Sequence, residues 1–185
     1  MTISISPMPL HQLADGLSEP QQDQLRRYQP LITGDQGNYI GWILANAPLE
    51  QVWSVLTDYS QFPQFLPTVV AAEILETNGD RKVVEQTDQR RLLLMNVKSK
   101  VRTENIEKAP DRIDFRLLEG DLKTLQGRWK IHLAVVGENQ VQTLITQTVN
   151  AEANAGLFEG MFHQVFESSL RDNLKAIRDE AEQRS

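Results

Sequence analysis

The chain has 185 residues, of which 40 % are hydrophobic and 24 % are charged. This length and composition are typical of one globular domain with a substantial core, not of a disordered chain. The formal net charge is −6, with 25 acidic against 19 basic residues. That balance argues against nucleic acid as a partner, because a general phosphate-binding surface needs an excess of Lys and Arg. There is no cysteine, which excludes disulfides, thiolate nucleophiles and cysteine-ligated metals.

The first 36 residues are predicted to form an N-terminal extension, and residues 37–185 to form the main domain. The opening MTISISPMPL lacks the basic start and continuous apolar stretch of a secretory signal. No apolar run approaches the roughly 20 residues that are needed to cross a bilayer. We therefore expect a cytoplasmic protein, with any membrane contact limited to the surface.

The extension contains one helix signal. Ser18 is a good N-cap, Pro20 suits a first helical turn, and Gln21 falls three residues after the cap. These residues predict a short helix over 19–28 that stops before Pro30. The extension could also act as an arm that binds a partner protein.

A strand followed by two helices is predicted next. Residues 38–46 are aromatic and β-branched, as in a strand, and Pro48 ends this segment. Apolar residues then recur at spacings of three and four over 49–59, which predicts a helix with one apolar face. A second short helix is predicted over 60–65.

After these helices the hydrophobic period changes to two. Six further strands are predicted, over residues 69–77, 81–89, 92–104, 112–119, 122–136 and 140–152. The connections between them are short, and Asn78-Gly79 is a strong hairpin signal. Because parallel strands need a crossover of a dozen or more residues, the sheet must be antiparallel. With the strand over 38–46, the count is seven.

The alternation within these strands predicts one covered and one solvated face. Ile113 and Phe115 alternate with Arg112 and Asp114, and Trp129 alternates with basic neighbours in the same way. In this register the Arg and Lys side chains point outward and the inner wall is apolar. A register error of one residue would reverse the two faces.

A long C-terminal helix is predicted over 157–182, where no proline occurs and the last glycine is Gly160. Its apolar stripe consists of Leu157, Phe158, Met161, Phe162, Val165, Phe166, Leu170, Leu174 and Ile177. Such a helix spans roughly 35–40 Å, at about 1.5 Å per residue, and can cover a whole sheet. The fold class is therefore α+β.

Two stretches carry a resemblance to a known family. The first contains Ala47-Pro48, Val52-Trp53, Asp58-Tyr59 and Phe62-Pro63, and the second contains Phe115, Glu119-Gly120, Leu125, Gly127 and Trp129. With the terminal helix, they resemble the START-like superfamily of helix-grip proteins, also called the SRPBCC or polyketide cyclase/dehydrase group. The second stretch is similar to the coenzyme Q-binding branch. The resemblance implies a seven-stranded curved antiparallel sheet wrapped around the C-terminal helix, with two short helices after the first strand.

This fold would place an apolar cavity between the sheet and the helix. The leading hypothesis is a non-enzymatic protein that binds a lipid or prenylated quinone there. The candidate ligand-binding residues are Phe115, Trp129, Phe158, Met161, Phe162 and Phe166, with Phe62 and Phe65 at the mouth. Residues 62–66 are the expected apolar contact with a membrane surface from which the ligand is collected. No catalytic residue, metal site or cofactor is predicted, since no His or carboxylate cluster has ligand spacing.

Two alternatives stay open. One is an enzyme of the polyketide cyclase/dehydrase kind, which would need titratable side chains pointing into the cavity. The other is a non-catalytic interaction module that assembles a larger complex through the N-terminal extension. His163 on the terminal helix is a weak candidate for catalysis, because the sequence offers it no partner.

Overall fold

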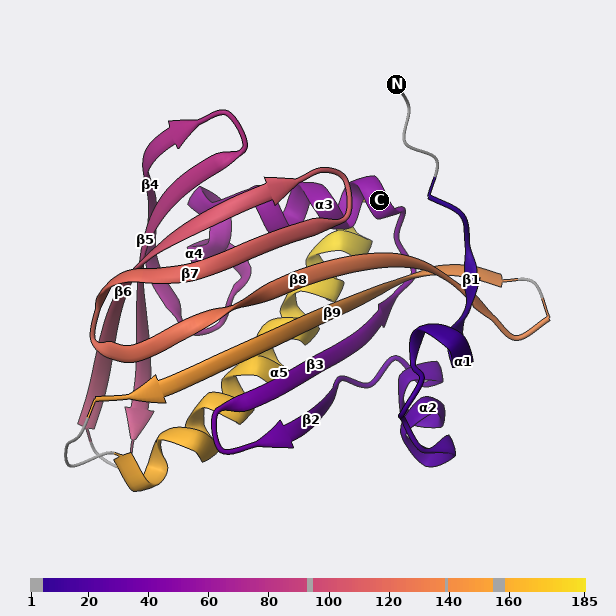
Figure 1. The fold of residues 1–185 in the computed structure, drawn as a ribbon, viewed down its shortest axis with the longest axis horizontal. Coiled ribbons are helices and arrows are strands. Elements are labelled where there is room, and N and C mark those ends of the chain that lie inside the picture. The colour runs from indigo at the N-terminus through magenta and orange to yellow at the C-terminus, as the bar shows by residue number, and fades with distance from the viewer. Residues whose placement is uncertain (1–4, 93–94, 139, 155–158) are drawn as a thin grey trace.

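The computed structural model describes residues 5–92, 95–138, 140–154 and 159–185. Within these residues one nine-stranded sheet is crossed by the C-terminal helix α5 (Glu159–Gln183) (Figure 1). The strands are β1 (Met8–Pro9), β2 (Leu31–Asp35), β3 (Asn38–Ala45), β4 (Val69–Asn78), β5 (Arg81–Leu92), β6 (Met95–Lys108), β7 (Arg112–Gly120), β8 (Leu122–Val136) and β9 (Gln140–Ala153). The other helices are α1 (Leu10–Leu13), α2 (Glu19–Arg26), α3 (Leu49–Thr57), the 3-10 turn η1 (Tyr59–Gln61) and α4 (Phe62–Phe65).

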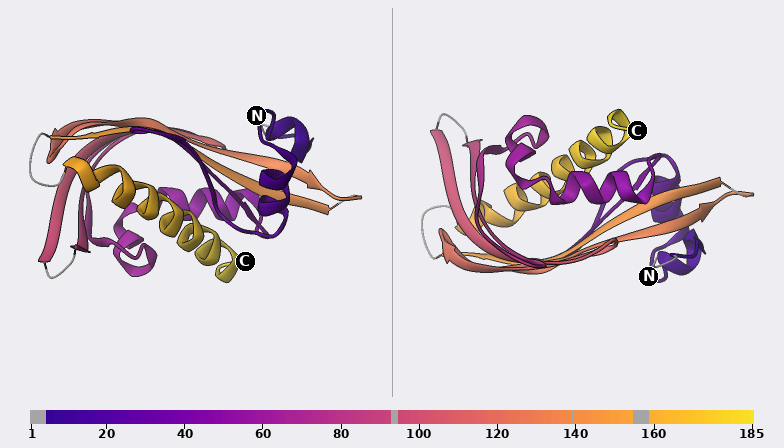
Figure 2. Two further views of the ribbon diagram at one scale, coloured as in Figure 1. Left: turned by 90° about the horizontal axis from the view of Figure 1, so that it is seen from below. Right: turned by 90° about the horizontal axis from the view of Figure 1, so that it is seen from above.

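The order of the strands is β2-β3-β9-β8-β7-β6-β5-β4, and every neighbouring pair in this path is antiparallel. The sheet is curved, and α3 and α5 lie against its concave face (Figure 2). Helix α5 rests directly on the backbone of β3, where a Cβ added to Gly41 would lie 2.6 Å from Leu174 Cδ1. Leu174 is fully buried. The inner face of the sheet and one side of α5 therefore form the main core.

All seven predicted strands have counterparts, and the predicted antiparallel α+β fold is confirmed. The structure adds two strands, both within the first 36 residues. β2 forms a hairpin with β3 through Gln36 and Gly37, whose φ angles of 47° and 92° are both positive. This geometry fits a two-residue turn of type I′. The signal was missed because Gln-Gly is a weaker turn signature than Asn-Gly.

The N-terminal helices cover part of the convex face of the sheet (Figures 1 and 2). Leu10 and Leu25 are buried in one cluster with Leu44, Ala134 and Leu144 of the sheet. The predicted helix signal is correct, because the Ser18 N–H donates to Gln21 Oε1 at 2.8 Å at the start of α2. The expectation of a wholly solvated outer face is wrong, since apolar side chains at one end of that face are covered by residues 10–31.

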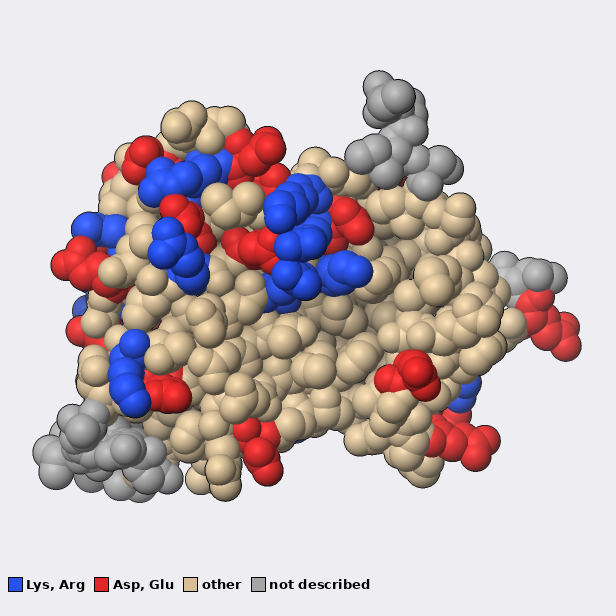
Figure 3. Space-filling model, in the orientation of Figure 1, with Lys and Arg blue, Asp and Glu red and all other residues tan. Residues whose placement is uncertain are grey.

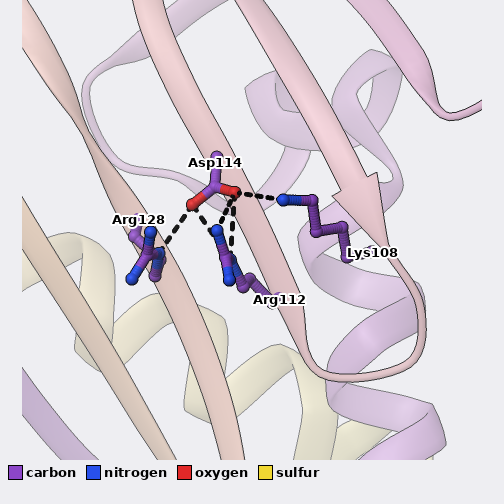
Figure 4. Close-up of polar contacts among 4 residues, drawn as sticks. All are labelled: Lys108, Arg112, Asp114 and Arg128. Carbon is purple, nitrogen blue, oxygen red and sulfur yellow. Dashed lines mark hydrogen bonds and ion pairs between the residues drawn. The ribbon is translucent and has the colours of Figure 1, made fainter.

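The rest of the convex face carries paired charges on β5 to β8, as Figure 3 shows. At the centre of one cluster, Asp114 accepts hydrogen bonds from Arg112, Arg128 and Lys108 at 2.6–3.1 Å (Figure 4). Partial burial raises the pKa of Asp114, but the three cations lower it more, so the net pKa lies well below its usual range. The outward register that was predicted for β7 and β8 is therefore confirmed.

Candidate ligand-binding cavity

A cavity of about 440 Å³ lies between the concave face of the sheet and α5. Its wall is built by inward side chains of β5 to β9, by one side of α5, and by residues of α3 to α4. The volume falls within the usual range for small-molecule sites in proteins, roughly 300–1,000 Å³. The cavity is therefore large enough to hold an organic ligand.

Aromatic and apolar side chains dominate the wall next to the N-terminal half of α5. Phe115, Trp129, Met161, Phe162 and Phe166 all line the cavity. The rings of Phe162 and Phe166 lie 5.3 Å apart, centroid to centroid, and Met161 is 39 % exposed. Met161 therefore lies at a rim where solvent reaches an apolar surface.

The Phe115 ring occupies space that is free only because the neighbouring strand has a glycine there. Gly127 is its partner in β8, and a Cβ there would lie 2.8 Å from Phe115 Cζ and 2.0 Å from the Thr148 carbonyl oxygen. Any larger residue would therefore press against both the ring and the backbone of β9. This explains physically why a glycine interrupts an otherwise β-prone strand.

The remaining predicted residues lie in different places. Phe62 lines the cavity, whereas Phe65 packs edge-on against Phe62, with the Arg184 guanidinium 5.8 Å from the centre of its ring. Phe158 lies outside the described residues. Leu66 is buried, and Phe62 and Phe65 are only partly exposed. Residues 62–66 are thus largely packed in this structure and do not form an open apolar loop.

A polar row on β5 was not predicted. Gln86, Asp88 and Arg90 line the cavity, and their partners on β6 are Val101, Ser99 and Val97, which also line it. Residues directly opposite each other in antiparallel strands share a face. The predicted apolar inner wall is therefore incomplete, because β5, for which the prediction named no inner face, places Arg90 on it.

Asp88 is held by hydrogen bonds on both carboxylate oxygens. Thr68 Oγ1 donates to Oδ1 at 2.9 Å, and Gln86 Nε2 donates to Oδ2 at 2.8 Å. Burial raises the pKa of Asp88, and these hydrogen bonds and the charge of Arg90 partly offset that effect. The cavity therefore contains a titratable carboxyl group with a fixed orientation.

Arg90 is less well paired than Asp88. Its Nη1 lies 3.8 Å from Asp172 Oδ2 on α5, which is too long for a hydrogen bond. Its Nη2 is buried and has no hydrogen-bond partner among the described residues. Burial lowers the pKa of Arg90, although the charges of Asp172 and Asp88 oppose this. Arg90 thus borders the cavity, and one of its donors is buried without a partner among the described residues.

A second polar group lies where η1 meets β6. Tyr59 lines the cavity, and burial together with Glu107 raises the pKa of its hydroxyl. Lys82 Nζ lies 2.9 Å from Glu107 Oε1 and 5.5 Å from the centre of the Tyr59 ring. The Tyr59 hydroxyl is itself buried and lies at Glu107, which does not line the cavity, so Tyr59 contributes its ring to the wall.

His163 has a partner that the sequence did not reveal. Its Nδ1 lies 3.3 Å from the Tyr39 hydroxyl, and its ring stacks edge-on against Phe162.

Within the described residues, no group of three or more His, Asp or Glu side chains could hold a metal ion. None of the helices in the described part of the chain is long and apolar enough to span a membrane.

The polar row was missed because β5 reads RKVVEQTDQRRL, in which both faces are mostly polar. Alternation alone then gives no sign of which face is inside. The prediction also ended this strand at residue 89, whereas β5 continues to Leu92 and carries Arg90 inward. The adjacent Val83 and Val84 are both buried and lie on opposite faces, so they gave no signal either.

Comparison with known proteins gives a family and several similar folds. Residues 45–178 match the family model described as polyketide cyclase / dehydrase and lipid transport. No curated protein matches the sequence.

Three of the similar solved structures illustrate the range of proteins with this fold. A START superfamily protein from Mycobacterium smegmatis has a TM-score of 0.65 and 19 % identity, covering 79 % of this chain and 97 % of its own. A STAR-related lipid transfer protein from Xanthomonas axonopodis has a TM-score of 0.61 and 18 % identity, covering 82 % and 98 %. The Zhui aromatase/cyclase from Streptomyces sp. R1128 has a TM-score of 0.61 and 20 % identity, covering 80 % and 94 %.

At these identities the structural matches establish the fold and leave the ligand open. The family model covers most of the 185 residues, including α3, the cavity strands and most of α5. The chain therefore belongs to the polyketide cyclase / dehydrase and lipid transport family, and it shares its fold with the START superfamily protein.

Proposed function

We propose that the protein binds a hydrophobic small molecule in the cavity between its sheet and α5. The observation that carries this proposal is the volume of about 440 Å³ with a wall of aromatic and aliphatic side chains. Burial of apolar ligand surface is favourable by roughly 25 cal/mol per Å², so such a wall can supply most of the binding free energy.

The ligand class that we propose is a lipid or a prenylated quinone. One similar structure is a STAR-related lipid transfer protein, which supports a lipid. The stretch from Phe115 to Trp129, which resembles the coenzyme Q-binding branch, lines the cavity and supports a quinone. Phe115, Trp129, Met161, Phe162, Phe166 and Phe62 are the proposed contacts, and Phe158 and Phe65 stay predictions without structural support.

Mass spectrometry tests this proposal. The protein is purified from its native host under mild conditions, extracted with organic solvent, and compared with an unrelated protein purified in parallel. We expect a reproducible isoprenoid or lipid in near-stoichiometric amount. Protein that is empty in repeated preparations, and that also fails to take up added lipids or quinones, would contradict the proposal.

A polyketide cyclase or dehydrase is the second candidate function, because titratable groups do face the cavity. Asp88 lines the cavity and has a raised pKa, and Arg90 lies beside it. Two of the similar structures are di-domain aromatase/cyclases, which match this chain with one part of their length. Incubation with a linear poly-β-ketone mimic, followed by chromatography, tests this function. Cyclised product that is lost in Asp88→Asn would favour the enzyme over the binding protein.

Access to a membrane-derived ligand would require an apolar contact surface. We place it at the rim around Met161, the exposed apolar residue nearest the described start of α5. A cytoplasmic protein of this kind would touch the membrane transiently. Binding to sedimented lipid vesicles that falls in Met161→Glu tests this placement, and unchanged binding contradicts it.

A role of residues 1–36 in binding a partner protein is the remaining proposal. In the described part of this segment, Leu10 and Leu25 pack against the sheet, so the polar surface of α2 is what a partner would meet. The exposed Asp23 and Arg26 of α2 form an ion pair at 2.6 Å. Loss of a complex in Asp23→Ala/Arg26→Ala, with ligand binding retained, would support an arm of this kind.

A further inference from the structure

We propose that Arg90 selects a neutral, carbonyl-bearing ligand by donating a hydrogen bond from Nη2 to the carbonyl oxygen, while Asp88 and Asp172 disfavour carboxylates. This inference rests on the proposed function, since it specifies the ligand of the same cavity. It gives Asp88, Arg90 and Asp172 a role in ligand specificity, which burial of a ligand against the apolar wall would not require.

The first step is the unused donor. The Arg90 side chain lines the cavity and is 21 % exposed, and its Nη2 is buried without a hydrogen-bond partner among the described residues, so a small rotation of the guanidinium would present this donor to a ligand. A guanidinium carries five N–H donors in a rigid plane and stays protonated at neutral pH. A buried donor without a partner costs free energy, which a ligand oxygen at hydrogen-bond distance would recover. The ligand therefore needs an acceptor atom near Arg90.

The second step is the charge around that donor. Asp172 Oδ2 on α5 lies 3.8 Å from Arg90 Nη1. Asp88 lies two residues before Arg90 on β5, on the same inward face, and the positive charge of Arg90 acts to lower its pKa. Lys98 also borders the cavity, but it is exposed and stands opposite Gln89, so its register directs it to the other face.

One cation is thus flanked by two carboxyl groups. A ligand carboxylate that approaches Arg90 would meet both Asp88 and Asp172, and the repulsion would be stronger from the part-buried Asp88 than from Asp172, which is 52 % exposed. A ketone, ester or quinone oxygen accepts the same hydrogen bond without a negative charge. The geometry therefore favours a neutral acceptor over an acid.

The third step is the surroundings of the acceptor. The opposite wall consists of Phe115, Phe162 and Phe166, which suit a chain or ring without polar groups. On α5, the Oδ1 of Asn173 is also buried and unpaired among the described residues, and Asn173 lines the cavity. A change of the Asn173 rotamer would let this oxygen accept a hydrogen bond from a hydroxyl group on the ligand. An apolar body with a carbonyl at the Arg90 end matches these features.

Competition binding tests the inference. Purified full-length protein is loaded with the fluorescent hydrocarbon diphenylhexatriene, which is displaced at neutral pH by a methyl ketone, an n-alkane and a fatty acid of equal chain length. We expect the ketone to bind about tenfold more tightly than the alkane, from one charge-assisted hydrogen bond. The ketone should also bind more tightly than the fatty acid.

Three variants assign the preference to residues. In Arg90→Met the ketone and the alkane should bind equally well. In the control Arg171→Met, which removes an exposed arginine of α5 that pairs with Glu167 at 3.0 Å, the preference should stay. In Asp172→Asn the fatty acid should gain affinity relative to the ketone.

Each outcome bears on a specific claim. A wild-type protein that binds the fatty acid best, or all three competitors equally, overturns the inference and leaves the proposed function intact. A ketone preference that survives in Arg90→Met also overturns it. If Arg90→Met does not fold, the wild-type series and Asp172→Asn decide alone. A protein that takes up neither the probe nor any competitor contradicts the proposed function itself.

Discussion

At the scale of single residues, Asp114 has the most highly charged environment on the convex face. Its folded-state pKa lies below its unfolded value because Arg112, Arg128 and Lys108 together outweigh its partial burial. A carboxyl group of this kind contributes stability above its unfolded pKa, near 3.8, and this contribution is lost as the pH falls through the folded pKa. Asp114 should therefore add to the sensitivity of the fold to acid.

Replacement of this residue should show that contribution. We expect Asp114→Asn to lower the free energy of unfolding at pH 7 by about 1–2 kcal/mol, because three cations lose their shared anion. Urea titrations at several pH values measure the effect, and the difference from wild type should shrink at strongly acidic pH. Glu119→Gln is the control, since Glu119 is 72 % exposed and, among the described residues, forms an ion pair with Arg102 only. Equal losses in both variants would contradict the prediction.

The alternation of apolar and polar residues predicted that Phe115 and Trp129 line the cavity, but it did not predict Asp88 and Arg90 there. Where a strand alternates apolar and charged residues, as at Ile113 to Arg116, burial follows from the pattern. Where a cavity accepts polar side chains, as along β5, the inner and outer faces look alike in sequence. Pairing with β6 decides which face is inside, and pairing is a property of the folded sheet.

At the scale of elements, α5 has two functions along its length. Leu174 is fully buried against Gly41 of β3, whereas Phe162 lines the cavity. Leu170 and Ile177 do both, since each is buried and each borders the cavity. Stability and ligand affinity should therefore separate along the helix.

Two alanine variants test this separation. Leu174→Ala should lower the free energy of unfolding by about 2–5 kcal/mol, because it leaves a cavity in the core, and it should change probe affinity little. Phe162→Ala should weaken the binding of an apolar probe by about tenfold or more, with a smaller loss of stability. Urea unfolding and fluorescence titration measure the two quantities. The reverse assignment would refute the division of α5.

The existence of the N-terminal helix α2 could be predicted from its capping residues, but its docking against the sheet could not. Few apolar residues mark it, and only Leu25 of its eight residues is buried. The contacts it makes with Ala134 and Leu144 join residues more than a hundred positions apart. Sequence patterns report periodicity within a segment and carry no information on such distant pairing.

Leu25→Ala tests whether this docking stabilises the fold. We expect a loss of about 2–5 kcal/mol, since Leu25 is completely buried. Leu118→Ala, at a position that is 41 % exposed, should change stability by less than about 0.5 kcal/mol. Calorimetry measures both. A Leu25→Ala protein as stable as wild type would show that residues 1–36 rest on the sheet without supporting it.

At the scale of the whole molecule, the order of strand, two helices, six strands and long helix was predictable because each change of period is visible in the sequence. The curvature of the sheet and the empty volume beneath it were not predictable. They depend on how far α5 stands from β5 to β7 once it is anchored on β3. The same anchoring leaves the apolar cavity on which the proposed function depends.

Two adjacent serines on α5 allow the most direct test of ligand binding in this cavity. Ser169 lines the cavity and donates from its hydroxyl to the Val165 carbonyl oxygen at 2.8 Å, whereas Ser168 is exposed. Ser169→Phe should fill the cavity, while Ser168→Phe places the same ring in solvent.

Native mass spectrometry of the protein from its host measures ligand occupancy, and titration with an apolar fluorescent probe measures affinity. We expect bound ligand in wild type and Ser168→Phe, and a loss of at least about tenfold in affinity in Ser169→Phe. Equal binding by all three folded proteins would contradict a binding site in this cavity.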